Sequence, residues 1–173
     1  MVQLQDYLLG ETVYEGPETR VRRATQLESG ARLVAKLPVS AAPGLRIVGR
    51  LIHESQILAK LAQVPGVVRV HALQQQGGSA ALLLHDPGFR SLDRVLSQKG
   101  KLSVDSALRI GVGLCRVLEG VHACGVMHKD VKPHKGKSGS SRSRIVPRRG
   151  GLLTFMNDAA EKPPGARLPA PKN

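Results

Sequence analysis

The chain has 173 residues, enough for one ordinary domain or for a small domain and part of a second. Hydrophobic residues make up 41% of it, but Trp is absent and only two Tyr and two Phe occur, so the core is predicted to consist of Leu, Val, Ala and Ile. Single-stranded nucleic acids are usually bound on aromatic stacking surfaces, and this composition therefore argues against nucleic-acid binding.

The formal net charge of +13 is unevenly distributed. Residues 1–133 contain 17 Lys and Arg against 11 Asp and Glu, whereas residues 134–173 contain nine against two. Clustered cations attract polyanions, but no helical face or interleaved aromatic residue organises this charge. A basic, disordered tail is therefore the favoured interpretation of 134–173, with polyanion binding as the alternative.

The two cysteines, Cys115 and Cys124, lie nine residues apart on one predicted helix, too far apart for a disulfide bond. They belong to no metal-ligand cluster and are expected to be packed, reduced thiols. No apolar run approaches the roughly 20 residues of a membrane helix, and the N-terminus lacks the pattern of a signal peptide. These features predict a cytoplasmic protein without a membrane partner.

Short apolar runs in residues 7–37 predict an antiparallel meander of β-strands, separated by turn residues at Gly16-Pro17 and at 28–30. In the last strand, 32–37, Val34 and Lys36 share one face. A lysine beside a valine suits a nucleotide cleft, although a strand lysine is more often solvated or protects a sheet edge.

Residues 46–62 are predicted to form an amphipathic helix, because apolar residues recur on one helical face. Glu54 lies on that face, between Leu51 and Leu58. A carboxylate within an apolar stripe is costly unless it is paired, so a cation from elsewhere is expected to meet it. The alternative is that Glu54 sits at the edge of the stripe near solvent.

Two further strands are predicted at 67–73 and 80–84, joined by a flexible turn at 74–78. Residues 91–96 are predicted to form a short helix, and 103–124 carry the clearest helical pattern of the chain. Ser103 is a suitable N-cap for this long helix, and Gly125 is a suitable stop.

After the long helix, Val126 to Pro133 reads V-M-H-K-D-V-K-P. This run resembles the catalytic loop H-R-D-x-K-P-x-N of protein kinases. The resemblance implies that Asp130 accepts or orients the substrate hydroxyl proton and that Lys132 steadies the transferring phosphate. Lys135 stands at the position of the family's metal-binding Asn.

Residues 14–24 are similar to the kinase glycine-rich loop, although only its middle glycine, Gly16, is kept. Taken alone, this segment is better explained as a plain hairpin turn. The resemblance further implies that Lys36 pairs with Glu54 and with nucleotide phosphates, and that Leu84 to Gly88 form the hinge that binds the adenine. The implied nucleotide-binding residues are Gly16, Val21, Val34, Lys36, Glu54, Leu84 and Asp86.

The order and spacing of these motifs imply an α+β, protein-kinase-like fold in which a five-stranded antiparallel small lobe with one helix is followed by the first helices of a large lobe. The expected divisions are a small lobe and hinge at 6–88, the start of the large lobe at 89–133, and the tail at 134–173. The kinase pattern stops at Pro133, and D-F-G, which carries a magnesium ligand, does not follow. A truncated or frameshifted copy is therefore expected.

The motifs of this chain, which include H-K-D in place of H-R-D, resemble those of the kinase-like domain at the front of bacterial hybrid sensor histidine kinases. The resemblance implies ATP as ligand, a protein substrate or signalling partner, and Mg²⁺ as the family's cofactor, although its protein ligands are missing here. Two function classes stay open. One is an impaired Ser/Thr kinase that transfers phosphate from ATP, and the other is a non-catalytic nucleotide-binding or interaction module.

Overall fold

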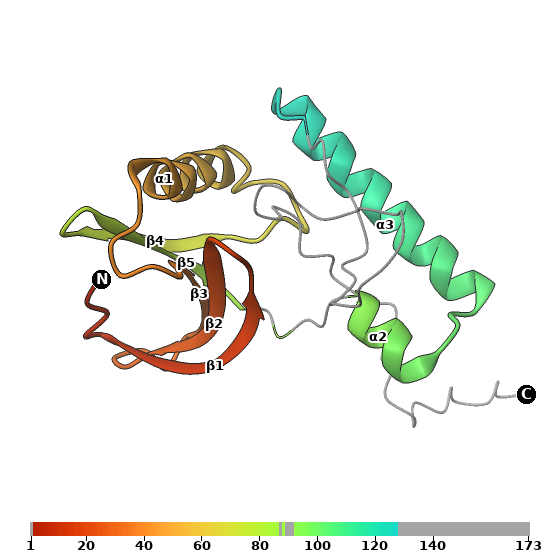
Figure 1. The fold of residues 1–173 in the computed structure, drawn as a ribbon. Helices are drawn as coiled ribbons and strands as arrows, with labels where there is room; N and C mark the ends of the chain where they lie inside the picture. The colour runs from red at the N-terminus through yellow and green to blue at the C-terminus, as the bar shows by residue number, and fades with distance from the viewer. Residues whose placement is uncertain (1, 87, 89–91, 128–173) are drawn as a thin grey trace, which may run out of the picture.

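The computed structural model describes residues 2–86, 88 and 92–127, drawn in colour in Figure 1. Within these residues five strands and three helices follow one another along the chain. They are β1 (Tyr7–Glu15), β2 (Thr19–Gln26), β3 (Arg32–Pro38), α1 (Leu45–Lys60), β4 (Val70–Gln76), β5 (Ser79–His85), α2 (Leu92–Lys99) and α3 (Val104–Ala123). The strands form one antiparallel sheet in the order β1-β2-β3-β5-β4, which confirms the predicted α+β architecture.

The hairpin between β4 and β5 is tighter than the sequence predicted. Residues 74–76, expected to form part of a flexible turn, belong to β4, and Gln76 pairs directly with Ser79. Gly77 and Gly78 both have positive φ angles, the backbone conformation that a two-residue hairpin requires. Residues 74–76 therefore lengthen β4 and do not belong to the turn.

The sheet buries apolar side chains on both faces. On one face, Leu33, Ala35 and Leu83 form a core with Ala24 inside the curl of the sheet. On the other face, α1 covers β4 and β5 and contributes Leu51 and Leu58 to a second core, which its C-cap residue Leu61 joins. The predicted apolar stripe of this helix is therefore confirmed, and Figure 1 shows the helix lying across the sheet.

Helix α3 reaches this second core only through its C-terminal half. Val121 is fully buried there, and Val117 and Val126 pack against the same cluster. The predicted N-cap is also present, because the Ser103 hydroxyl oxygen accepts a hydrogen bond from the Ser106 amide at 3.2 Å. The other end of the helix diverges from the sheet (Figure 1).

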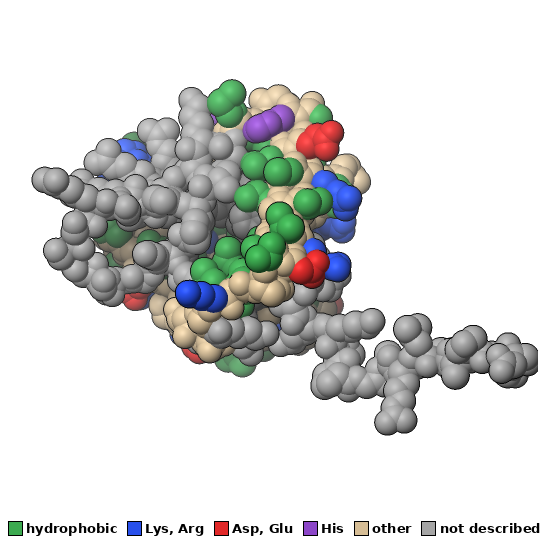
Figure 2. Space-filling model, turned by 90° about the vertical axis from the view of Figure 1, so that its right-hand side faces the viewer, with side chains coloured by type: hydrophobic (Ala, Val, Ile, Leu, Met, Phe, Trp, Pro, Cys, Tyr) green, Lys and Arg blue, Asp and Glu red, His purple; other side chains and the backbone are tan. Residues whose placement is uncertain are grey.

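The N-terminal half of α3 presents apolar side chains to solvent. Val104, Leu108 and Val112 are 77%, 64% and 51% exposed, and Figure 2 shows hydrophobic side chains following this helix. The prediction that Cys115 and Cys124 are packed thiols is wrong, since both are exposed. Their helix packs through its Val117 and Val121 side, and Cys115 lies on the outward side while Cys124 caps the C-terminus.

Among the described residues, no helix combines the length and the apolar character needed to cross a membrane.

Candidate functional site

The α1-facing side of the sheet gathers the residues that the sequence predicted to bind nucleotide. Val21 pairs with Lys36 across β2 and β3, and Val34 pairs with Leu84 across β3 and β5. Because residues paired across strands, and residues two apart along a strand, share a face, these four side chains form one continuous surface. Val21 and Val34 are half-buried and Leu84 is buried.

Lys36 and Glu54 form an ion pair on this face. The Lys36 Nζ lies 2.6 Å from the Glu54 Oε2, and the two side chains are only 10% and 12% exposed. The predicted pairing of the helix carboxylate with a cation is therefore confirmed. It fixes the lysine ammonium beside Val21 on the α1-facing side of the sheet.

The turn between β1 and β2 is closed by its own hydrogen bonds. The Gly16 amide donates to the Thr19 carbonyl at 2.9 Å, and the Tyr14 ring lies so close that a Cβ at Gly16 would be 2.9 Å from the tyrosine hydroxyl. A side chain at position 16 would have to push the end of the Tyr14 side chain aside, and the Gly16 amide is already engaged. A bound phosphate would have to displace this bond to use it.

Two arginines of α1 hold the same turn. Arg46 and Arg50, one helical turn apart, both donate to the carboxylate of Glu18. This contact was not foreseen, although the spacing of the two arginines on one helix face was visible in the sequence. It ties the β1–β2 turn to the helix that supplies Glu54.

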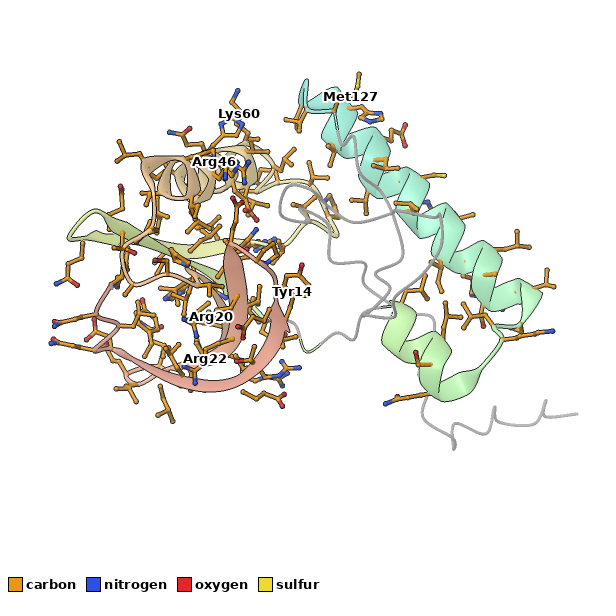
Figure 3. All side chains as sticks on the ribbon, in the orientation of Figure 1. Tyr14, Arg20, Arg22, Arg46, Lys60 and Met127 are labelled. Carbon is orange, nitrogen blue, oxygen red and sulfur yellow. The ribbon has the colours of Figure 1, made fainter. Side chains whose placement is uncertain are left out.

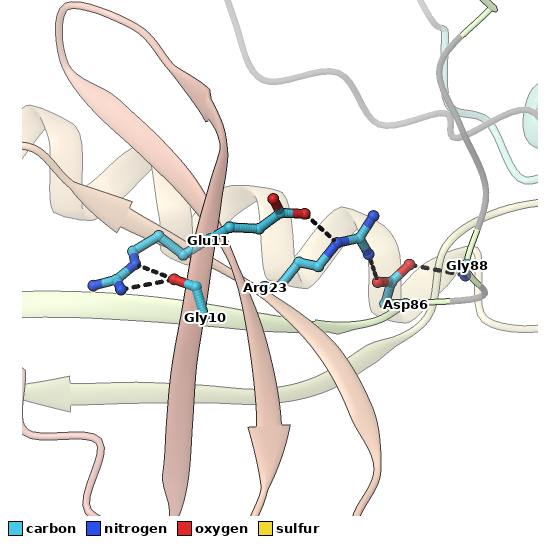
Figure 4. Close-up of polar contacts among 6 residues, drawn as sticks. Gly10, Glu11, Arg23, Asp86 and Gly88 are labelled. Atoms are coloured by element: carbon cyan, nitrogen blue, oxygen red, sulfur yellow. Dashed lines mark hydrogen bonds and ion pairs between the residues drawn. The ribbon is translucent and has the colours of Figure 1, made fainter. Parts of the chain in front are cut away.

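Hydrogen bonds and an ion pair also hold the segment that follows β5. The Asp86 carboxylate accepts from Arg23 of β2 and from the Gly88 amide, the latter at 2.9 Å, as Figure 4 shows. The His85 and Asp86 amides donate to the carbonyls of Arg69 and Arg32. These amides are all engaged, and the carboxylate of Asp86, one of the residues predicted to bind nucleotide, holds the segment to β2.

The predicted catalytic residues Asp130 and Lys132 lie outside the described residues, as do Lys135 and the tail at 134–173. Among the residues that the structure does describe, no group of three or more His, Cys, Asp or Glu side chains is arranged to hold a metal ion. The described part of the site is thus a lysine–carboxylate pair on an apolar surface, which could hold the phosphates and base of a nucleotide but supplies no metal centre.

The sequence of the chain is similar to those of several protein kinases. The chain is 30% identical over 142 residues to the serine/threonine-protein kinase PkaA of Streptomyces coelicolor, a match that covers 73% of this chain and 25% of that protein. It is 26% identical over 136 residues to CBL-interacting protein kinase 20 of Oryza sativa, covering 76% of this chain and 29% of the relative. It is 36% identical over 84 residues to the serine/threonine-protein kinase PknH of Mycobacterium tuberculosis, covering 49% and 13%.

No family model matches the chain. The chain spans less than a third of the length of these relatives. Together with the five-stranded sheet and its helix, the similarities support a protein-kinase-like domain whose fold is that of a kinase N-terminal lobe.

Proposed function

We propose that this kinase-like domain binds ATP on the α1-facing side of its sheet, with Lys36 on the phosphates and Val21, Val34 and Leu84 against the base. The observation that carries the proposal is the buried Lys36–Glu54 pair at 2.6 Å beside these apolar side chains. The pair holds the ammonium in one place before any ligand arrives, which reduces the entropy lost on binding. Magnesium would enter with the triphosphate.

The proposed phosphoryl transfer is strongly impaired. By resemblance, Asp130 orients a substrate hydroxyl and Lys132 steadies the phosphate, but Lys135 replaces the Asn that would hold a metal ion. A cation at this position repels magnesium, which neutralises the charge that develops on the phosphate oxygens. Losing several kcal/mol of such stabilisation lowers turnover by orders of magnitude, since about 1.4 kcal/mol is tenfold in rate.

Titration of the full chain with ATP and Mg²⁺ tests the binding proposal. The variant Lys36→Met is expected to weaken ATP binding at least tenfold, whereas Lys60→Met, which removes an exposed lysine in the last turn of α1, leaves the affinity unchanged. The double variant Lys36→Met/Glu54→Leu removes the unpaired carboxylate and should bind as weakly as the single variant. Equal affinity of Lys36→Met and the unmodified chain would refute the proposal.

Phosphate transfer is tested with radiolabelled ATP, Mg²⁺ and generic protein substrates. We expect incorporation no greater than that of the Asp130→Asn variant. Turnover that disappears in this variant would show that transfer is intact.

Two alternatives rest on sequence features. A non-catalytic interaction module would keep its partner binding in Lys36→Met, and polyanion binding by the tail would be salt-dependent and lost when 134–173 is deleted. We further infer, from H-K-D and the Tyr14 to Ala24 pattern, a place at the front of a hybrid sensor histidine kinase. Neighbouring DNA that encodes no histidine-kinase module would count against that placement.

A further inference from the structure

The sheet face opposite α1 contains a cavity of about 140 Å³ that the nucleotide proposal does not use. Its apolar walls come from the N-terminal segment and from β1, β3 and β5, and two serines, Ser40 and Ser79, also line it. The apolar walls are formed by Val2, Leu4, Leu9, Leu37, Pro38 and Ala80. Two arginines of β2, Arg20 and Arg22, also line it, and Figure 3 shows both within the curl of the sheet.

Both guanidinium groups are held by backbone carbonyls. The Arg20 Nη2 donates to the Val39 carbonyl at 2.8 Å, and the Arg22 Nε and Nη2 donate to the Gly10 carbonyl at 3.0 and 2.7 Å. Arg20 pairs with Leu37 and Arg22 with Ala35, so the two arginines point to the same side of the sheet. Each group is therefore oriented without any ligand.

The cavity carries positive charge without a matching anion. Both arginines are half-buried, and no Asp or Glu is among the residues that line the cavity. Within the described part of the chain neither forms an ion pair, whereas Arg23, Arg46 and Arg50 each meet a carboxylate. A guanidinium has five N–H donors, and Arg20 engages one carbonyl, so donors are left for an anion.

We propose that this cavity binds a small organic anion, namely a carboxylate carried on a compact apolar body. The carboxylate would accept hydrogen bonds from Arg20 and meet the charge of Arg22, because a planar guanidinium matches two carboxylate oxygens. The apolar body would contact Leu4, Leu9 and Leu37. A cavity of about 150 Å³ with apolar walls holds benzene, so benzoate has a suitable size.

Titration of the full chain with benzoate, followed by NMR chemical shifts or calorimetry, tests the proposal. Benzamide, which has the same shape without the charge, is expected to bind at least tenfold more weakly. Arg20→Gln is expected to weaken benzoate binding at least tenfold. The matched control, Arg109→Gln on the exposed surface of α3, should leave it unchanged.

A second variant separates loss of the site from loss of the fold. Leu37→Phe keeps both arginines and fills the cavity, so it should abolish benzoate binding while thermal unfolding shows a folded chain. Saturating ATP should not affect benzoate affinity, because the two sites lie on opposite faces of the sheet. The proposal is overturned if benzamide binds as well as benzoate, if Arg20→Gln and Leu37→Phe both bind normally, or if ATP displaces benzoate.

Discussion

Lys36 and Glu54 form an ion pair that is largely shielded from solvent, since their side chains are 10% and 12% exposed. Breaking a buried ion pair by removing one charge is more damaging than removing both, because the remaining charge stays desolvated and unpaired. The pair therefore couples the fold to the proposed function.

We expect Glu54→Gln to lower the free energy of unfolding by about 3 kcal/mol, measured by urea denaturation. The double variant Lys36→Met/Glu54→Leu should recover most of this loss, because apolar side chains of similar volume replace the pair. Glu119→Gln, on the exposed surface of α3, serves as the control and should change little. A double variant as unstable as the sum of both single variants would contradict the expectation.

His85 makes stability depend on pH. Although His85 is exposed, its pKa lies below the usual 6.5 because neighbouring atoms partly desolvate the ring and because His71 and Arg69 disfavour its charged form, and its ring packs edge-on against His71 with the ring centroids 5.3 Å apart. With a lower pKa in the folded state, protons bind preferentially to the unfolded chain. This stability is complete above pH 6.5 and is lost as the pH falls from 6.5 to the folded-state pKa.

We therefore expect the free energy of unfolding to decrease as the pH is lowered from 8 to 5. The decrease should be less steep in His85→Gln than in the unmodified chain. His53→Gln, on the exposed surface of α1, should retain the original dependence. Identical curves for the unmodified chain and His85→Gln would show that this histidine is not responsible.

At the scale of elements, the contact between α3 and the loop after α1 depends on a close backbone approach. A Cβ added at Gly120 would lie 2.7 Å from the Cγ1 of Val64, a buried and β-branched side chain that has little room to move. Gly113, on the same helix, has open space around it. Alanine substitutions at these two glycines therefore distinguish the effect of helix propensity from the effect of packing.

We expect Gly113→Ala to stabilise the chain by up to about 1 kcal/mol, the gain in helix propensity. Gly120→Ala should instead destabilise it by about 1 kcal/mol or more, because overpacking outweighs that gain. Thermal unfolding of both variants gives the comparison. Equal stabilisation by the two would mean that α3 does not pack closely on Val64.

Local patterns predicted the strands, α1 and the cap of α3, because alternation, helical periodicity and cap chemistry are encoded within short segments. The pairing of Glu54 with a cation was predictable because an unpaired carboxylate on an apolar stripe is energetically costly. Two other ion pairs were not predictable, namely Glu18 with Arg46 and Arg23 with Asp86. Their residues are far apart in the sequence, and only the three-dimensional arrangement brings them together. The exposure of Cys115 was missed because the sequence shows a face but not what covers it.

For the molecule as a whole, the exposed apolar side of α3 has a consequence for association. Val104, Leu108 and Val112 recur every four residues and form a continuous stripe. Exposed apolar surface of this kind promotes self-association.

We expect Leu108→Glu/Val112→Glu to reduce concentration-dependent association, measured by light scattering, without lowering the unfolding temperature. Leu58→Glu, at a buried position of α1, is the contrasting control and should unfold the chain. Unchanged association in the first variant would show that other surfaces are responsible.

The burial of Val121 among side chains of α1 and β5 also bears on how the protein is made. Synthesis proceeds from the N-terminus at roughly 5–20 residues per second, so Leu51 and Leu58 leave the ribosome several seconds before Val121 does. During that interval the sheet and α1 can form, but the valine that completes their shared core is still missing. The nascent chain therefore exposes an apolar surface for which chaperones can compete until α3 emerges.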